Sequence, residues 1–368
     1  MKKNIFLFIG LWLFCSFLSG TSSEIRSDSI PEESVSLIFA GDIMGHSPQY
    51  KAAYNAENQK YDYEPCFRFI KKYVEEADFG IVNLETPVAG KPYSGYPNFS
   101  NPDALLDALK DAGYDVLLTA NNHVADRGKS GLERTIRQIS RRNLKFAGSY
   151  LSQEQRDTVY PVILTKDSFK IALFNYTYGT NGHTVLAPDI VNMIDTNLIK
   201  SDLKRLENKN IDFRIIYLHW GTEYQLQANE QQRQLAAWLA NLGFDLVIGS
   251  HPHVVQNAEF LQIGDRVVPV IYSLGNSISN QRKENTNGGI MLQVSIGTKN
   301  HKVNEISYMP VYVYKGSLFG KFQYYLIPTV HFKKNTQQYP ISAQDSLTLL
   351  RFDSLTTDRL QNLQLLQY

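Results

Sequence analysis

Phe244-Asp245-Leu246-Val247-Ile248-Gly249-Ser250-His251-Pro252-His253 is the stretch of the sequence that decides the fold. Its first half is apolar and rich in branched residues, which is typical of a buried strand. Gly249 and Ser250 end that strand, and two histidines follow. If this segment is extended, His251 and His253 point to the same side, because side chains alternate along extended backbone. Two neutral imidazoles directed at one point suit a transition-metal ion. A polar turn that merely contains two histidines is the alternative that this stretch alone leaves open.

A second stretch has the same layout, Asp111-Ala112-Gly113-Tyr114-Asp115-Val116-Leu117-Leu118-Thr119-Ala120-Asn121-Asn122-His123. Each stretch has a helix-like approach, a glycine, an aromatic residue, an aspartate, three aliphatic residues and a polar loop. His123 lies ten residues after Gly113, as His253 lies ten residues after Gly243. The echo favours a repeated helix–strand–loop unit in which the loop carries the chemistry.

Three further apolar segments end in residues that bind metals. Residues 35–40 lead to Asp42, residues 79–84 lead to Glu85, and residues 213–218 lead to His219. Open α/β sheets bind their ligands at the carboxyl ends of the strands. Five strands that each deliver Asp, Glu, Asn or His at that end predict one shared site.

The sequence predicts an α/β protein with much parallel sheet. Apolar strand segments alternate with amphipathic helical segments at 65–77, 103–113, 131–142, 198–208 and 235–242, and this alternation is typical of layered α/β domains. We expect a main domain at 34–300 and a C-terminal extension at 301–368 that packs on it. The 37 basic and 36 acidic residues balance, so the composition carries no electrostatic signature of a nucleic-acid-binding protein.

The N-terminus has the pattern of a secretory signal peptide. Lys2 and Lys3 precede an apolar stretch of signal length, and small polar residues follow. We expect a signal peptide at 1–23, a linker at 24–33, and export to the periplasm or cell envelope. An uncleaved membrane anchor is the alternative.

Six motifs occur in a fixed order along the chain: Ala40-Gly41-Asp42-Ile43-Met44, Asn83-Leu84-Glu85, Asn121-Asn122-His123 with Asp126 and Gly128, His219-Trp220-Gly221-Thr222-Glu223-Tyr224, Gly249 to Gln256, and Tyr272-Ser273-Leu274-Gly275-Asn276. The set resembles the CapA family, which is linked to poly-γ-glutamate capsule synthesis. The resemblance covers roughly residues 34–300. It implies a fold similar to the calcineurin-like metallophosphoesterases, a four-layer α/β/β/α sandwich.

The resemblance also implies a site for two divalent ions, with Mn, Fe or Zn as candidates. In that reading Asp42 and His253 hold one ion, and Asn122, His219 and His251 hold the other. Glu85 stands where metallophosphoesterases carry a bridging aspartate. Two such ions can share a hydroxide and clamp the oxygens of a phosphorus centre.

Other residues of the motifs are candidates for catalysis and substrate binding. His123 would protonate a leaving group or stabilise an anion at the mouth of the site, and Asp126 would orient its imidazole. Arg127 is a candidate anion contact, although an arginine after a loop is usually just solvated. Glu223 and Tyr224 follow His219 closely enough to line the pocket, and core packing is the alternative for Tyr224.

The first motif departs from the phosphoesterase pattern. Those enzymes carry Asp-x-His, whereas this chain has Asp42-Ile43-Met44. A thioether does not replace an imidazole for a borderline or hard cation, so one metal position is expected to be weakened. His46, two residues farther on, is a candidate substitute.

Two functional hypotheses follow from these observations. The first is an exported metal-dependent hydrolase-like protein that acts on poly-γ-glutamate, another surface polymer or a phospho-intermediate. The second is a non-catalytic envelope factor that binds an anionic polymer and assists its synthesis or export. In either case the expected partners are an anionic polymer or phospho-substrate and the polymer synthase or export machinery, with no nucleic acid.

Overall fold

The computed structural model describes residues 33–366. The predicted signal peptide at 1–23 and all but the last residue of the predicted linker lie outside this part. Within it, none of the helices combines the length and the apolar character that crossing a bilayer requires.

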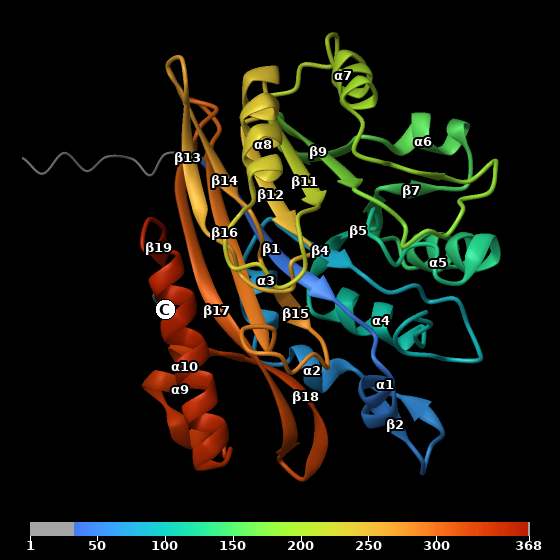
Figure 1. Cartoon of the computed structure of the whole chain (residues 1–368), viewed down its shortest axis with the longest axis vertical. Helices are drawn as coiled ribbons and strands as arrows, with labels where there is room; N and C mark the ends of the chain where they lie inside the picture. The colour runs from blue at the N-terminus through green and yellow to red at the C-terminus, as the bar shows by residue number, and fades with distance from the viewer. Residues whose placement is uncertain (1–32, 367–368) are drawn as a thin grey trace, which may run out of the picture. The chain divides into compact units, whose positions relative to one another are not determined.

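The larger of two main sheets has nine strands and is mixed. Its order is β18-β17-β16-β1-β4-β5-β6, with β15 beside β1 and β19 beside β17 (Figure 1). The strands β1, β4, β5 and β6 run parallel, the pairs β1–β16, β16–β17 and β17–β18 are antiparallel, and β19 is parallel to β17. The bounds are β1 Ser34–Ile43, β4 Phe79–Leu84, β5 Tyr114–Leu118, β6 Lys145–Ala147, β15 Asn276–Ile278, β16 Gly288–Gly297, β17 Val303–Leu318, β18 Lys321–Pro328 and β19 Gln364–Leu365.

The second main sheet has six strands in the order β13-β14-β12-β11-β9-β8. Its central strands β9, β11, β12 and β14 are parallel, and β8 and β13 close its edges as antiparallel strands. The bounds are β8 Val162–Lys166, β9 Phe169–Thr177, β11 Phe213–His219, β12 Leu246–Ser250, β13 Ala258–Ile263 and β14 Arg266–Ile271. Two small ribbons pair β2 Tyr54–Asn55 with β3 Lys60–Tyr61, and β7 Ser149–Tyr150 with β10 Ile190–Val191.

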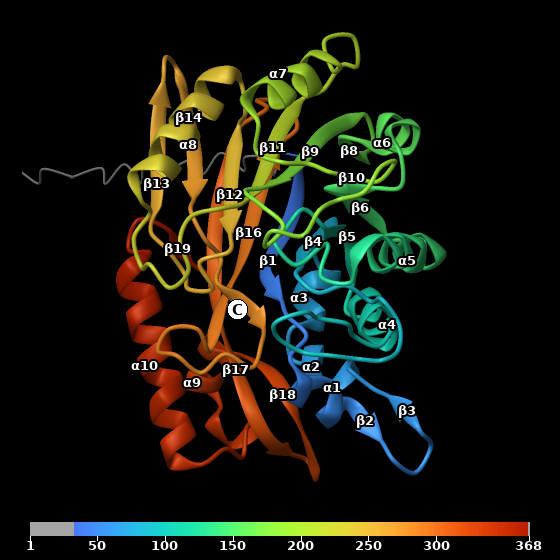
Figure 2. The ribbon, with the colours of Figure 1, turned by 45° about the vertical axis from the view of Figure 1, so that its right-hand side comes forward.

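Helices lie along both sheets. The bounds are α1 Ser47–Ala53, α2 Glu64–Phe67, α3 Lys71–Glu75, α4 Ala104–Asp111, α5 Gly128–Arg141, α6 Gln153–Val159, α7 Thr196–Lys204, α8 Glu230–Leu242, α9 Thr329–Lys334 and α10 Ala343–Arg359, with a short 3-10 turn η1 Thr336–Gln338. Figures 1 and 2 show α4 and α5 beside β5 and β6, α8 beside β12 and β13, and α10 along β17.

The two main sheets meet directly. Lys166 at the end of β8 donates to Ser34 O of β1 over 3.2 Å and pairs with Asp78 at 2.8 Å. Apolar residues of both sheets, such as Val82 of β4 and Leu218 of β11, are buried in a single core cluster. The predicted α/β sandwich with mixed sheets is therefore confirmed.

The helix α8 shows how local sequence positions the decisive strand. Asn229 caps its first turn in a reciprocal capping box with Gln232, and Gly243 ends it at a φ of 112°. A left-handed residue at this position favours glycine, because residues with a Cβ rarely adopt a positive φ. The chain then turns directly into β12, whose carboxyl end leads to His251.

One predicted helix is wrong in extent. The segment 65–77 forms two short helices, α2 and α3, rather than one. Ile70 N bonds to Phe67 O and Tyr73 N bonds to Ile70 O, so three-residue turns replace the regular helical ladder between them. The C-terminal residues also do more than cover the domain, since β17 and β18 extend the nine-stranded sheet. The domain boundaries at 300 and 301 stay a prediction.

The close approach of β1 to Gly275, the residue before β15, gives a first testable prediction. A Cβ on Gly41 would lie 1.9 Å from Gly275 O, so the two backbones would have to separate. We expect Gly41→Ala to reduce the free energy of unfolding by about 1–3 kcal/mol. Gly179→Ala is the control, because no atom lies within 4 Å of its Cβ position. Urea unfolding should separate the two variants, and equal midpoints would contradict this account of the close approach.

Candidate metal centre

The candidate site lies where the carboxyl ends of both sheets meet. The strand β1 carries Asp42, Glu85 follows β4, and the turn after β5 carries Asn122. From the other sheet, His219 ends β11 and His251 follows β12. The carboxyl ends of neighbouring parallel strands lie at one edge of a sheet, so these side chains converge as the strand-end pattern predicts.

Two groups of potential ligands occur in the described part of the chain. One is Asp42, Glu85 and His219, and the other is Glu85, His251 and His253. In each group the ligand atoms lie within 4.8 Å of one another, and every member is buried. Glu85 belongs to both, as a bridging ligand would. The assignment of each remaining residue to one of two ions stays a prediction.

Asp42 and His253 form one side of the cluster. His253 Nδ1 lies 3.1 Å from Asp42 Oδ2 and 3.1 Å from Asn276 Oδ1. Asn83 donates from Nδ2 to the other oxygen of Asp42 over 2.7 Å. These contacts leave His253 Nε2 on the side of Glu85, 3.6 Å from its Oε1.

His219 occupies the other side. Its Nε2 lies 2.9 Å from Asn122 Oδ1 and 3.5 Å from Glu85 Oε1. Its Nδ1 lies 3.0 Å from Ser250 Oγ, which fixes the ring plane from behind. Hydrogen bonding of the second ring nitrogen is the usual way to orient a ligating histidine.

Unsatisfied polar atoms show that these residues fit a cation. Both carboxylate oxygens of Glu85 and the Nδ1 of His251 are buried. None of these three atoms has a hydrogen-bond partner among residues 33–366. A buried carboxylate without a partner is costly, and a bound cation removes that cost. Three imidazoles and two carboxylates form a nitrogen and oxygen donor set that suits Mn, Fe or Zn.

The electrostatics of the cluster follow from its burial. Burial, and then the charge of Asp42, raises the pKa of Glu85 well above its usual value. Burial lowers the pKa of His219 to about 3 and that of His251 to about 2, which favours the neutral imidazoles that bind metals.

His253 and Asp42 behave as a charged pair. Burial opposes charge on His253, but Glu85 and Asp42 outweigh it and raise its pKa to about 9. Burial would raise the pKa of Asp42, yet the hydrogen bond and charge of His253 bring it to about 2. The neighbouring carboxylates therefore attract a positive charge at this position.

The backbone that presents the two histidines differs from the sequence prediction. The segment is not extended, because His251 has a φ of 98° and His253 a φ of 58°. Their rings converge, with centroids 5.9 Å apart, through left-handed backbone rather than through strand alternation. Such backbone costs about 1–3 kcal/mol per residue and is found mostly at functional sites. Tyr224, also left-handed at 67°, donates from its N to Pro252 O over 2.8 Å and braces the turn.

His46 does not replace the histidine that Met44 lacks. Neither ligand group of the described residues contains it. Its Nδ1 accepts from Asn280 N over 3.2 Å, and Gln49 Oε1 lies 3.1 Å away. Met44 itself is buried, at 3% exposure.

The remaining predicted residues surround the cluster. His123 Nδ1 lies 2.8 Å from Asp126 Oδ2, which also accepts from Phe99 N over 2.7 Å. Tyr224 is half-buried with its ring 6.3 Å from that of His253, and Glu223 beside it is exposed. Arg127 donates to Ser94 Oγ over 3.1 Å.

Sequence reasoning missed three participants. Tyr178 follows β9, is 46% exposed, and places its ring 4.5 Å from that of His251. The strand-end rule, applied to β9, would have found it. Asn83 and Asn276 lie within the quoted motifs, but only the structure shows that they hold Asp42 and His253.

The family model described as "Bacterial capsule synthesis protein PGA_cap" matches residues 36–281. The capsule biosynthesis protein CapA of Bacillus anthracis is 25% identical over 296 residues, which cover 77% of this chain and 69% of that protein. The PGA biosynthesis protein CapA of Bacillus subtilis is 27% identical over 333 residues, covering 83% and 80%.

Solved structures with a similar fold include a phosphatase from Mycoplasma pneumoniae, with a TM-score of 0.43 and 17% identity over 76% of this chain and 94% of that one. The NAD nucleotidase of Haemophilus influenzae has a TM-score of 0.48 and 10% identity over 91% and 64%. At these scores the assignment of the fold rests on the sheets of this chain itself.

Removal of the ligands tests the metal centre. We expect the purified chain to retain Mn, Fe or Zn by elemental analysis, and His251→Ala/His253→Ala to lose it. A ligand present at a hundred times its Kd stabilises a protein by about 2.7 kcal/mol, so chelation should lower the Tm of the wild type only. His301→Ala, an exposed histidine outside the cluster, should keep the metal. A wild type that binds no metal after supplementation would contradict the assignment.

Proposed function

The chain belongs to the family of bacterial capsule synthesis proteins, and we propose that it is an exported, divalent-metal-dependent hydrolase of surface-polymer biosynthesis. Its substrate in this proposal is poly-γ-glutamate, another anionic surface polymer or a phospho-intermediate. It would act in the periplasm or at the cell envelope, beside the machinery that makes or exports the polymer.

The observation that carries the proposal is the environment of Glu85. Its carboxylate is fully buried, is common to both ligand groups, and accepts no hydrogen bond from the described residues. Asp42, Glu85, Asn122, His219, His251 and His253 would hold the ions. Bound divalent ions would supply Lewis-acid chemistry and a nucleophilic hydroxide near neutral pH.

His123 supports the hydrolytic proposal as a proton donor. Asp126 Oδ2 lies 2.8 Å from its Nδ1, so in the doubly protonated ring Nδ1–H would donate to Asp126 and Nε2 would carry the proton given to the leaving group. The structure gives Nε2 no hydrogen-bond partner among the described residues. The Phe99 N–H fixes Asp126 in turn, and the Phe99 ring packs 4.6 Å from the His123 ring. The imidazole is therefore oriented before substrate arrives, as general acid catalysis requires.

Met44 favours a second candidate function. Met44 replaces the imidazole ligand that the metallophosphoesterase pattern has at this position. His46 does not substitute for it, because its Nδ1 accepts a hydrogen bond from Asn280 N. A chain with only part of the expected donor set would suit a non-catalytic factor that binds an anionic polymer and assists its synthesis or export.

Substitution of His123 separates the two functions. We expect the metal-loaded wild type to hydrolyse a phosphodiester such as bis(p-nitrophenyl) phosphate or to shorten poly-γ-glutamate. His123→Gln should lower kcat by about 10²–10⁴-fold, because it removes the proton donor and leaves the metal ligands in place. Asp126→Asn should lower kcat less and change the pH profile, since Asp126 acts through the imidazole.

Metal content provides the control for these variants. Both should retain the metal of the wild type, whereas His219→Ala should lose metal and turnover together. Absence of turnover in the metal-loaded wild type on both substrates, with normal polymer output from cells carrying His123→Gln, would establish the binding factor instead.

A further inference from the structure

The loop at 279–287 leads away from the metal centre and carries two cations that no carboxylate neutralises. Arg282 and Lys283 are exposed, and neither forms an ion pair within the described part of the chain. Lys315 on β17, also exposed, likewise pairs with no carboxylate there. By contrast, Lys321 on the adjacent strand lies 2.6 Å from Asp62. The chain as a whole has a formal net charge of only +1, so this unpaired positive charge is local.

Distances place these cations in a row. Lys283 Nζ lies 4.1 Å from the ring centroid of Tyr224, which is itself 6.3 Å from His253. Arg282 Cζ and Lys315 Nζ lie 5.6 Å and 5.7 Å from the ring centroid of Tyr324. The row therefore begins beside the metal centre and continues along the loop to β17.

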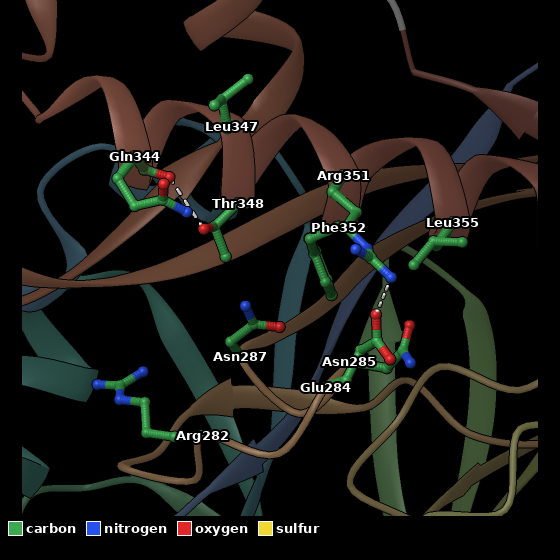
Figure 3. A pocket seen from close by; sticks show the side chains of 10 residues that line it. All are labelled: Arg282, Glu284, Asn285, Asn287, Gln344, Leu347, Thr348, Arg351, Phe352 and Leu355. Carbon is green, nitrogen blue, oxygen red and sulfur yellow. Dashed lines mark hydrogen bonds and ion pairs between the residues drawn. The ribbon is translucent and has the colours of Figure 1, made fainter.

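A cavity of about 380 Å³ lies at the far side of the same loop, against α10. Figure 3 shows Arg282, Glu284 and Asn285 on the loop facing Gln344, Arg351 and Phe352 on the helix. Arg351 reaches Glu284 at 2.6 Å, but both side chains are mostly exposed, at 71% and 60%. Such a surface pair contributes little stability, so a ligand carboxylate can replace Glu284 at small cost.

The loop is held in place by the residues that shape the metal centre. Asn276, which contacts His253 through Oδ1, donates from Nδ2 to Gln281 Oε1 over 2.9 Å and to Thr286 O over 2.7 Å. Tyr324 donates to Asn280 Oδ1 over 2.5 Å, and Lys315 Nζ lies 3.3 Å from the same oxygen. The cations are thus presented in a fixed arrangement, which reduces the entropy lost on binding.

We propose that Lys283, Arg282, Lys315 and Arg351 form a cationic track that binds an extended polycarboxylate chain and leads it to the metal centre. This inference rests on the proposed function and deepens it by assigning the residues that hold the polymer. A small phosphate ester reaches only the start of the track. An extended polyanion contacts several cations at once, and each further contact is intramolecular.

The chemistry of the track favours carboxylates over nucleic acid. Single-stranded nucleic acid binds by stacking bases on open aromatic faces. Here Lys283 covers a face of Tyr224, and Tyr324 is fully buried between Arg282 and Lys315. The track therefore offers charge without a stacking platform.

The test measures binding of fluorescently labelled poly-γ-glutamate by anisotropy. Arg282→Gln/Lys283→Gln/Lys315→Gln should weaken binding about tenfold, because it removes three charge contacts with the polymer. Affinity of the wild type should also fall with added salt, and fall less steeply in the track variant. Lys71→Gln/Arg137→Gln/Lys321→Gln is the control, because it removes three solvent-accessible cations that have acidic partners. Equal weakening in both variants, or no binding by the wild type, would overturn the track.

Two further binding measurements distinguish a failure of the track from a failure of the proposed hydrolase function. His219→Ala should lose metal but bind the polymer within about threefold of the wild type, because His219 contacts neither the track nor Asn276, which holds its loop. Retained binding without hydrolysis would sustain the track while the hydrolase proposal failed, and loss of binding in that variant would overturn it. An oligodeoxynucleotide of matched charge should bind more weakly than poly-γ-glutamate, and tighter binding would overturn the assignment to carboxylates.

Discussion

A buried carboxylate that accepts no hydrogen bond from the described residues is the constraint on which the site depends. Glu85 lies where the carboxyl ends of the two sheets meet, at 0% exposure. A chain that only needed to pack this region would fill it with an apolar side chain, because burying an unpaired carboxylate is costly. Glu85 lies among three histidines and Asp42, and a bound cation would give its carboxylate the partner that no hydrogen bond supplies. The surrounding polar residues Asn83, Ser250 and Asn276 each fix one ligand and leave the face toward Glu85 unobstructed.

The strained turn after β12 shows what that arrangement costs. Two ligands of this turn, His251 and His253, adopt positive φ values that residues with a side chain normally avoid. The backbone before these histidines is closely packed, because a Cβ on Gly249 would lie 2.2 Å from both Trp220 Nε1 and Tyr272 O. The strand is held tightly against its neighbours, and the turn that follows it adopts strained backbone at His251 and His253. This distribution is expected where the surrounding structure overdetermines a functional geometry.

The sequence predicts this architecture well wherever a short-range rule governs it. Buried strands are read from runs of branched residues, and the end of α8 is read from Gly243. The proximity of Asp42 and Glu85 follows from the rule that neighbouring parallel strands end together, whereas His219 comes from the second sheet, which packs against the first. Prediction from the sequence fails where the structure depends on contacts between distant segments. The left-handed turn at His251 is braced by Tyr224 and Asp42, which no local pattern reveals. The role of Tyr178 depends on the pairing of β9 with β11, and the break between α2 and α3 has no marker in residues 65–77.

Asn276 connects the metal centre to the loop at 279–287. Its carbonyl oxygen contacts His253, and its amide nitrogen holds the loop that carries Arg282 and Lys283. One side chain therefore fixes both the orientation of a ligand and the position of the track. A shift of the loop would be transmitted to His253, because a buried amide with both ends engaged cannot move without breaking one of its hydrogen bonds. Asn276 is 0% exposed, so no water replaces a lost contact from outside. Asn276 therefore joins the loop directly to a ligand of the centre, without intervening packed side chains.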